Sequence, residues 1–275
     1  MPEGDTIFRA ARTLKAALAG KTVTRFDTVL PYLARVHHDT PITGRIIEDV
    51  TSHGKWMEMR FSGDLILLTH MLMSGSWHIY RPGEKWQRPK NDMRILIATE
   101  SIDAVAFKVP VAEFHTSASL ARRPGFNQLG QDVLAPDFSE EEAIAQLRSH
   151  ANLEVGEALL KQSLLAGIGN VYKSEVAFAC RVNPFRLASS LTDDELTCLV
   201  RTARKYLLAN VKETSGERIV TYTGFRRTTG RANPGDRLWV YGRAHQPCRK
   251  CGTSIRTRRQ GAGARVTFWC PNCQH

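Results

Sequence analysis

The sequence lacks several features, and each absence excludes a class of protein. It contains no apolar run of the roughly 20 residues that a helix needs to cross a bilayer. Its start lacks the character of a secretory signal, because Glu3 and Asp5 are acidic. There is no internal repeat, no extended low-complexity tract, and no coiled coil or other assembly motif. We therefore expect a monomeric, intracellular, cytoplasmic globular protein without a membrane anchor.

Acidic residues are nearly absent from the C-terminal end of the chain. Residues 218–275 contain eleven arginines and Lys250, but their only acidic residue is Asp236. The preceding 217 residues carry 26 basic and 26 acidic side chains, so the net charge of +11 comes from this end. Such a block is typical of a surface that binds a polyanion, and nucleic acid is the favoured partner. Charge alone also fits a solvated arginine-rich surface or a membrane-facing patch.

Three domains are predicted from the changes in periodicity along the chain. Residues 1–125 begin with an amphipathic helix, expected to be capped by Asp5 and stopped by Gly20, and continue in short β-rich runs typical of a sandwich. Residues 126–240 carry mainly helical patterns, and residues 241–275 contain a hairpin pattern between cysteines. We therefore predict an α+β multidomain fold, with a leading helix and an N-terminal β-sandwich.

Two capping boxes mark helix starts in the helical domain. Ser139 with Glu142 begins one helix. Thr192 with Glu195 begins a long amphipathic helix that is expected to continue to about Lys212. In each box the hydroxyl and the carboxylate satisfy backbone amides that the first helical turn leaves without a partner.

Two shorter helices are expected between these boxes. They cover residues 156–166 and 170–182, and the tight GIG stretch at 167–169 separates them. After the long helix, residues 214–236 are polar and rich in Gly, Thr and Arg, so we expect a loop there.

Only six cysteines occur, and four of them form two short pairs in the basic block. CRKC contains Cys248 and Cys251, CPNC contains Cys270 and Cys273, and 18 residues lie between the pairs. This spacing predicts one tetrahedral zinc site, with a β-hairpin between the pairs and QGAGA as its turn. Four thiolates leave no position for water, so the zinc is expected to be structural rather than catalytic.

The remaining two cysteines, Cys180 and Cys198, lie within helical patterns and are expected to be buried free thiols. Disulfides are the alternative for the cysteine pairs, but they are rare in the reducing interior of a cell. His245 and His275 flank the four-cysteine cluster and are not needed as ligands.

Six short motifs are spread over nearly the whole chain: PEG at 2–4, GK at 54–55, HMLMSGSW at 70–77, GIGNVYKSE at 167–175, VYGR at 240–243 and the CRKC…CPNC finger. In this order they resemble the formamidopyrimidine-DNA glycosylase and endonuclease VIII family of base-excision repair enzymes. The resemblance implies a helix-two-turn-helix in the helical domain, a zinc-finger β-hairpin at the C-terminus, and damaged DNA as the partner. Agreement of all six motifs is far more specific than any single one.

The resemblance implies a covalent role for Pro2. Once Met1 is removed, its secondary amine can attack the sugar C1′, displace the damaged base and start the β,δ-elimination that nicks the backbone. An unperturbed α-amino group has a pKa of about 7.7 to 8.0, so part of it is unprotonated at neutral pH. Glu3 matches the family's general acid. By itself Glu3 would be a carboxylate favoured by the helix dipole.

Four further positions match the family's DNA contacts. Lys55 matches a lysine that contacts phosphate near the reaction, and we place it with the catalytic residues, although alone it would be an exposed turn lysine. Asn170 opens the second helix of the pair, where phosphate binding and simple N-capping are both open. Arg265 matches the finger arginine that grips a phosphate with its fork, and we place it with the catalytic as well as the DNA-binding residues. Met73 matches a side chain that fills the gap left by the flipped nucleotide, although a methionine in an apolar run is more often core.

The chain also departs from the family pattern. Thr6 stands where a second glutamate is common, and residues 104–114 reproduce no alignable void-filling pattern, so Phe107 and Lys108 are unassigned. The stretch GERIVTYTGFRRTTG at 216–230 lacks the pattern of the purine-specific branch. Together with PEG at the start, this favours the endonuclease VIII branch, whose substrates are oxidised pyrimidines such as thymine glycol.

Two alternatives stay open at this point. One is a purine-type enzyme of the same family that acts on formamidopyrimidines and 8-oxoguanine. The other is a zinc-finger protein that binds damaged DNA without chemistry. Pro2, Glu3 and Lys55 argue against the second, because phosphate binding needs neither an imine-forming terminus nor an acid beside it.

Overall fold

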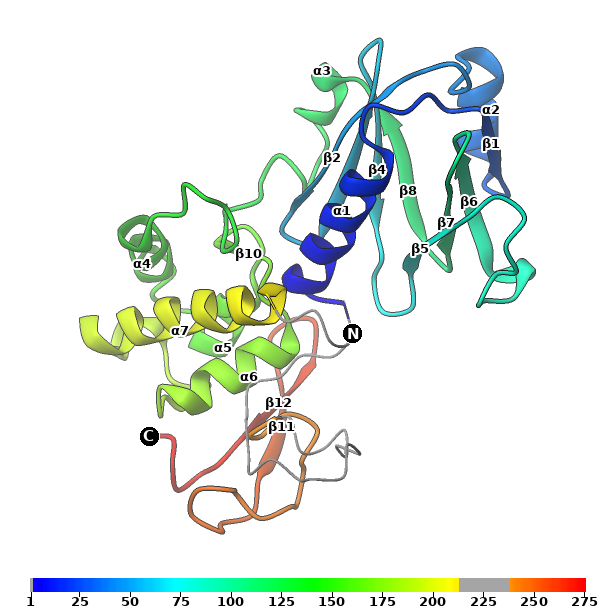
Figure 1. Ribbon diagram of the computed structural model, residues 1–275. Coiled ribbons are helices and arrows are strands. Elements are labelled where there is room, and N and C mark those ends of the chain that lie inside the picture. Colours follow the sequence, from blue (N-terminus) through cyan, green and yellow to red (C-terminus); the bar gives the residue numbers. More distant parts are fainter. Residues whose placement is uncertain (1, 213–237) are drawn as a thin grey trace. The chain divides into compact units, whose positions relative to one another are not determined.

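The structure is a computed structural model of the chain, and it describes residues 2–212 and 238–275 (Figure 1). The chain divides into two compact units, Met1–Gln128 and Leu129–His275. Each unit contains its own cluster of buried apolar side chains. The loop expected over 214–236, which includes the stretch 216–230, lies outside the described residues. None of the described helices is both long enough and apolar enough to cross a membrane.

The first unit is a sandwich of two antiparallel four-stranded sheets, as predicted. One sheet has the order β1-β6-β7-β5, and its strands are β1 (Arg25–Thr28), β6 (Met93–Ala98), β7 (Asp103–Phe107) and β5 (Ser76–Tyr80). The other has the order β2-β3-β4-β8, and its strands are β2 (Ile47–His53), β3 (Trp56–Phe61), β4 (Leu65–His70) and β8 (Val111–His115). Met57 and Met59 of β3 share one buried cluster with Ile95 and Ile97 of β6. Each pair is spaced by two residues and so lies on one face of its strand, which is how alternating sequences build a sandwich core.

Helix α1 (Gly4–Leu18) packs against β2, β3 and β5 of the sandwich (Figure 1). Its apolar face is buried, as the periodicity predicts. The expected N-cap, Asp5, is wrong: Glu3 occupies that position in an extended conformation, and its carbonyl accepts hydrogen bonds from the amides of Thr6 and Ile7. Asp5 lies in the first turn, where it is buried 3.7 Å from Arg9. Gly20 follows the helix with φ +80°, so a glycine stop is placed correctly.

Three short helices complete the first unit. They are α2 (Pro31–Asp39), the 3-10 turn η1 (Lys90–Asp92) and α3 (Ser117–Leu120). Helix α2 buries Leu33 and packs against β1 and β8. None of these segments carries a motif of the candidate site.

The second unit is mainly helical and ends in a hairpin. Its helices are α4 (Glu140–Ser149), α5 (Val155–Leu160), α6 (Asn170–Ala179), η2 (Ala188–Ser190) and α7 (Asp193–Lys212). Its strands are β9 (Gln131–Asp132), β10 (Leu165–Ala166), β11 (Arg256–Gln260) and β12 (Arg265–Trp269). Strands β11 and β12 pair antiparallel around a turn at 261–264, as predicted for the finger. The helix expected over 156–166 is shorter than predicted, because residues 165–166 pair with β9.

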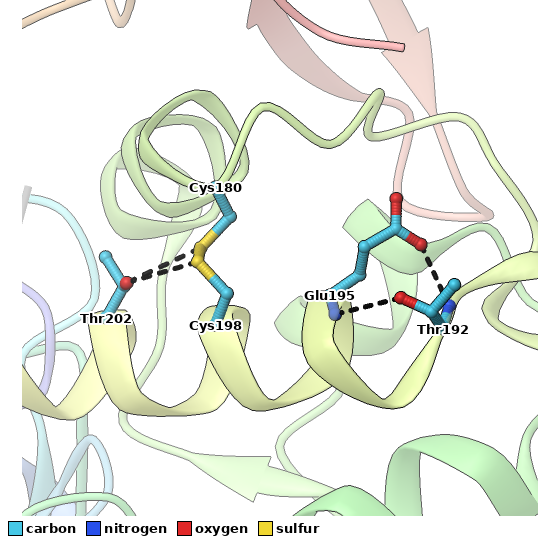
Figure 2. The surroundings of a disulfide bond; sticks show 5 residues. All are labelled: Cys180, Thr192, Glu195, Cys198 and Thr202. Atoms are coloured by element: carbon cyan, nitrogen blue, oxygen red, sulfur yellow. Dashed lines mark hydrogen bonds between the residues drawn. A yellow bond between two sulfur atoms is a disulfide. The ribbon is translucent and has the colours of Figure 1, made fainter.

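The two capping boxes differ in how completely they form. At α7 the Thr192 hydroxyl accepts from the Glu195 amide at 3.2 Å, and the Glu195 carboxylate accepts from the Thr192 amide at 2.9 Å (Figure 2). This box is confirmed, and α7 is helical as far as Lys212, the last residue described before 238. At α4 the Ser139 hydroxyl accepts from the Glu142 amide, but the Ser139 amide donates to the Gln131 side chain instead. A neighbouring glutamine therefore takes over half of the predicted box.

Cys180 and Cys198 form a disulfide, so the prediction of buried free thiols is wrong (Figure 2). Cys180 is the C-cap of α6 and Cys198 lies in the second turn of α7. Packing of α6 against α7 brings their Cα atoms to 5.8 Å, within the range that a disulfide spans. Both residues are half-buried. Sequence spacing gave no sign of this pairing, because it depends on how the two helices pack.

Candidate functional site

The start of α1 places an acid directly after the terminal imino acid. Pro2 is half-buried, and Glu3 at the N-cap is completely buried. The first turn of a helix carries backbone amides with partial positive charge, so a carboxyl group is favourably placed at this position. The carbonyl of Glu3 begins the helix, so its backbone cannot move without disturbing the first turn. The acid and the imino acid are thus held in one fixed, largely enclosed place.

Lys55 occupies a two-residue turn between β2 and β3. His53 and Trp56 are paired on either side of it, so only Gly54 and Lys55 make the reversal. Gly54 has φ +58°, a conformation that costs other residues energy because of their Cβ. The glycine of the GK motif therefore fixes the position from which the half-buried lysine extends.

His70 lies beside the turn that carries Lys55, and the sequence reasoning did not single it out. It ends β4 opposite Trp56, and the two ring centroids lie 4.8 Å apart. Burial, followed by the positive charges of Lys55 and Arg123, lowers its pKa to about 4. The ring is therefore neutral near pH 7, and its Nδ1 accepts a hydrogen bond from the Leu72 amide at 3.0 Å. The only signal in the sequence was its place at the head of HMLMSGSW.

The turn that follows His70 presents two apolar side chains to solvent. Met73 is 68% exposed and Leu72 is 48% exposed, so the core alternative for Met73 is wrong. Met71 is buried, and its carbonyl accepts from the Gly75 amide at 2.9 Å. A Cβ at Gly75 would lie 2.6 Å from that carbonyl, so only glycine closes this turn. The exposure of Leu72 was not anticipated.

The unassigned stretch 104–114 is mostly strand. Phe107 ends β7 with its side chain buried in a cluster with Tyr80 and Leu96. Lys108 lies in the following turn, where its ammonium is 3.1 Å from the Asp92 carboxylate. Phe107 is therefore a core residue, and Lys108 has an acidic partner of its own.

In the second unit a polar seam joins α6 to β12. Asn170 donates from Nδ2 to the Val266 carbonyl at 2.9 Å, and Lys173 donates from Nζ to the Thr267 hydroxyl at 2.6 Å. Gly169, not Asn170, is the N-cap of α6, so simple N-capping is not the role of Asn170. The seam places the start of β12, where Arg265 lies, beside the N-terminus of α6. Asn170 and Arg265 are 95 positions apart in sequence, and this contact brings their segments together.

Lys173 and Glu175 are buried charged residues of α6, and the sequence reasoning assigned them no structural role. The Glu175 carboxylate accepts hydrogen bonds from the consecutive amides of Trp239, Val240 and Tyr241 at 2.8, 2.9 and 2.8 Å. It therefore fixes the segment that leads into the finger. Charged residues inside an otherwise apolar helix were the available signal, because burying them requires specific partners.

The finger hairpin exposes arginines that differ in their partners. Arg258 donates to Glu154 at 2.8 Å and its guanidinium lies 3.6 Å from the centre of the Phe185 ring. Within residues 2–212 and 238–275, the exposed side chains of Arg256 and Arg265 have no ion-pair or hydrogen-bond partner. Their charges are therefore available to an external anion.

The four finger cysteines converge on one point, as predicted. Their sulfur atoms all lie within 4.8 Å of one another, with Cys251 to Cys270 at 3.5 Å and Cys248 to Cys273 at 3.9 Å. Zinc–sulfur bonds of about 2.3 Å in a tetrahedron require sulfur separations of roughly 3.8 Å. Hydrogen bonds with Thr253 lower the pKa of Cys251 to about 6, whereas burial raises the pKa of Cys270 and Cys273. The donor set fits a structural zinc, and it fits no site with an open ligand position.

Comparison with protein families gives three matches that together cover most of the chain. Residues 1–110 match the formamidopyrimidine-DNA glycosylase N-terminal domain, and residues 129–221 match the formamidopyrimidine-DNA glycosylase H2TH domain. Residues 246–275 match the zinc finger found in FPG and IleRS. With the geometry of its four cysteines, the finger is therefore a site for one structural zinc.

Relatives match the chain over its full length. "Probable endonuclease 8 2" of Streptomyces coelicolor is 43% identical over 277 residues, which cover 100% of this chain and 94% of that protein. "DNA-(apurinic or apyrimidinic site) lyase Nei2" of Mycolicibacterium smegmatis is 36% identical and covers 100% of this chain and 99% of that protein. The Lactococcus lactis Fpg, solved in complex with DNA that contains an abasic site, has a TM-score of 0.81 at 18% identity, with 100% of both chains covered. The chain belongs to the formamidopyrimidine-DNA glycosylase and endonuclease VIII family, on its endonuclease VIII branch.

Proposed function

We infer that this protein is a bifunctional DNA glycosylase with AP lyase activity in base-excision repair. The observation that carries this conclusion is the pair Pro2 and Glu3 at the start of α1, in a chain that matches endonuclease 8 and AP lyase relatives over its full length. A protein that only binds DNA has no need for a buried acid beside a terminal imino acid.

We propose that Pro2 is the nucleophile. After removal of Met1, its secondary amine attacks C1′ of the damaged nucleotide, a nitrogen–carbon bond forms, and the glycosidic bond to the damaged base breaks. Glu3 protonates the sugar ring oxygen as the ring opens, so the product is a cationic iminium. The iminium acidifies C2′, and β- and then δ-elimination release the two phosphates that flank the sugar. Burial of Glu3 directly beside Pro2 supports this role, because a general acid must be held next to the reacting sugar and away from bulk water.

Lys55, Asn170 and Arg265 are the proposed phosphate contacts. Lys55 is a point charge fixed by its two-residue turn. Asn170 lies in the first turn of α6, where backbone amides and the helix dipole favour an anion. The Arg265 guanidinium, which has no partner among the described residues, can bind a second phosphate with two parallel hydrogen bonds. The contact between α6 and β12 holds these last two groups as one anion-binding surface.

The turn at 71–75 is proposed to fill the space that a flipped nucleotide leaves. Chemistry at C1′ requires the nucleotide to leave the stack, at a cost of a few kcal/mol. Met73 and Leu72 are apolar side chains exposed on a turn that Gly75 and the neutral His70 hold in shape. An apolar side chain inserted between bases replaces part of the stacking that is lost.

Oxidised pyrimidines are the proposed substrates, and the protein is proposed to act as a monomer inside the cell. The endonuclease 8 names of its relatives and the PEG start support this substrate class over the purine lesions. The proposed working division is a catalytic domain over 1–125, a helical DNA-binding domain over 126–240, and the finger over 241–275.

Borohydride trapping on an oligonucleotide that carries one oxidised pyrimidine tests the proposal. The expected result is a covalent adduct that peptide sequencing places on Pro2, and its loss in Pro2→Gly together with a fall in strand cleavage of about 10²-fold or more. DNA affinity should stay within about twofold, because Pro2 contributes chemistry rather than phosphate binding. The same trapping is carried out with oligonucleotides that carry an abasic site or an oxidised purine. An adduct on these but not on the oxidised pyrimidine would support the covalent reaction and contradict the proposed substrate class. Tight binding without an adduct on any of the three, despite a free Pro2 amine, would leave a DNA-binding protein without chemistry.

A further inference from the structure

The Cys180–Cys198 disulfide lies at the edge of the helix pair, not in its core. Both cysteines are half-buried, and the hydroxyl of Thr202 lies 3.4 Å from the Cys180 sulfur and 3.8 Å from the Cys198 sulfur (Figure 2). A hydroxyl at this distance can donate to a sulfur that carries negative charge, which is the state that forms when a disulfide is cleaved. The bond therefore lies between two partly exposed residues, at a place where a released thiolate has a hydroxyl partner.

The residues directly after Cys180 hold the end of the zinc finger. The Val182 carbonyl accepts from the Gln274 side chain at 2.9 Å. The Asn183 amide donates to the His275 carbonyl at 2.9 Å, and the His275 amide donates to the Arg181 carbonyl at 3.0 Å. Segment 181–184 therefore forms the backbone support on which the last residues of the finger lie.

The same segment also contacts the finger hairpin. The Pro184 carbonyl accepts from the Gln260 side chain at 2.7 Å, and Gln260 accepts from the Thr267 hydroxyl at 2.8 Å. Thr267 is the residue of β12 that receives the Lys173 hydrogen bond from α6. Segment 181–184 is thus connected both to the end of the finger and to the strand that carries Arg265.

Gln274 connects this support to a zinc ligand. Its side-chain Oε1 accepts from the Cys270 backbone amide at 2.8 Å, and its backbone amide donates to the Cys270 carbonyl at 3.1 Å. The side chain is 2% exposed, so both of its polar atoms depend on protein partners. Hydrogen bonds therefore connect Cys270 through Gln274 to the Val182 carbonyl. Val182 lies two residues after Cys180, which is one half of the disulfide.

We propose that the Cys180–Cys198 disulfide is a reversible thiol–disulfide exchange site that controls how firmly segment 181–184 holds the zinc finger. Its reaction partners are low-molecular-weight thiols and their disulfides. A thiolate attacks one cysteine sulfur, the protein disulfide breaks, and a mixed disulfide forms as the other cysteine leaves as a thiolate that takes up a proton. A second thiol molecule then releases the first cysteine, so two thiols become one small disulfide and the protein gains two cysteine thiols. Oxidation by the small disulfide is the reverse of both steps.

Cleavage of the bond frees one end of the support. The disulfide joins the C-cap of α6 to α7 across 18 positions, and without it the segment between them is held only by hydrogen bonds and packing. The constraint that closes this loop is then lost, and part of that loss is expected to appear as local opening near the finger. The effect on DNA affinity rests on the proposed function, whereas the effect on zinc does not.

Zinc release provides the direct test. The intact protein is equilibrated in buffers with different ratios of reduced to oxidised glutathione, the state of Cys180 and Cys198 is read by alkylation and peptide mass, and zinc transfer to a chromogenic chelator is timed. We expect the disulfide to open while zinc stays bound, and zinc then to transfer roughly tenfold faster than from the oxidised protein. Equal rates in the two states, or cysteines that react only after unfolding, would overturn the proposal.

Two variants separate the disulfide from other thiol effects. Cys180→Ser with Cys198→Ser should release zinc at the fast rate in every buffer. Gln274→Leu removes the link between Val182 and Cys270, so its release rate should depend less on the glutathione ratio than that of the wild type. If the double variant does not fold, the comparison of oxidised with reduced wild type still decides the outcome. Affinity for an oligonucleotide with an abasic-site analogue is measured in parallel; if no state binds it, the proposed function fails while the zinc result still stands or falls separately.

Discussion

The candidate residues of the two units are positioned in different ways. In the first unit, short backbone features position them: a helix start places Glu3, a two-residue turn places Lys55, and a tight turn closed by Gly75 exposes Met73. In the second unit, contacts between segments that are distant in sequence position them. Asn170 is held by a carbonyl of β12, and the finger depends on metal ligands that come from both of its ends.

This difference suggests that amino-acid substitutions will have different consequences in the two units. A local change in the first unit should alter one group and leave the sandwich intact, because the large core is formed elsewhere. A change in the second unit should spread, because α6, the finger and segment 239–241 share buried polar contacts. The substitutions below test this difference between the two units, and they follow in order of decreasing expected effect.

Loss of the zinc should have the largest effect. Cys251→Ser removes one of four ligands, and binding of about 10 kcal/mol or more normally holds such a finger in its folded state. We expect no bound zinc by metal analysis and a DNA affinity at least about 100-fold weaker, while the circular dichroism of the sandwich persists. A metal-free variant with a folded finger would contradict the structural role of the metal.

Glu175→Gln should come next and should act on the second unit alone. The carboxylate accepts from three consecutive amides, and an amide side chain would turn an N–H group toward some of them. Leaving buried donors unsatisfied costs about 3 kcal/mol, measured as the change in unfolding free energy in urea. Glu140→Gln is the matched control, because this glutamate pairs with Arg201 at the surface. Equal effects of the two variants would mean that the segment at 239–241 does not depend on Glu175.

His70 should give the first unit a pH dependence in the acid range. Its folded-state pKa of about 4 lies below the usual value of 6.5, so the unfolded chain binds more protons between these limits. Stability should therefore rise with pH through this window and fall by up to about 2 kcal/mol as pH drops from 6.5 toward 4, after allowance for partial solvent screening. Urea unfolding of wild type and His70→Gln at several pH values measures it. An identical pH dependence in both proteins would exclude His70 as its source.

Arg265→Ala should have the smallest effect, and it should mainly weaken DNA binding. Removing one phosphate contact should lower the slope of log affinity against log salt by about 0.9 and weaken binding by roughly 1 kcal/mol near physiological salt. Arg258→Ala is the control, because Glu154 and Phe185 already engage that guanidinium. If Arg258→Ala changes the slope as much as Arg265→Ala does, general charge rather than a specific contact governs the finger.

Much of this protein was predictable from short patterns. The zinc ligands, the hairpin turn, the sandwich and the cap at Thr192 follow from spacing and periodicity, since each involves residues close in sequence or a repeat with a fixed period. The GK and PEG motifs likewise marked backbone positions that the structure shows to be a turn and a helix start.

Other features were decided only by tertiary packing. The spacing of Cys180 and Cys198 does not predict a disulfide between them. The local sequence also did not show that Glu3, rather than Asp5, would be the N-cap of α1. The neutral state of His70 depends on burial and on charges brought near it by separate segments. The sequence by itself determined which chemical groups are present and how neighbouring residues turn or pair. Which distant groups meet, and which charges lose their water, depends on contacts between segments that no local pattern encodes.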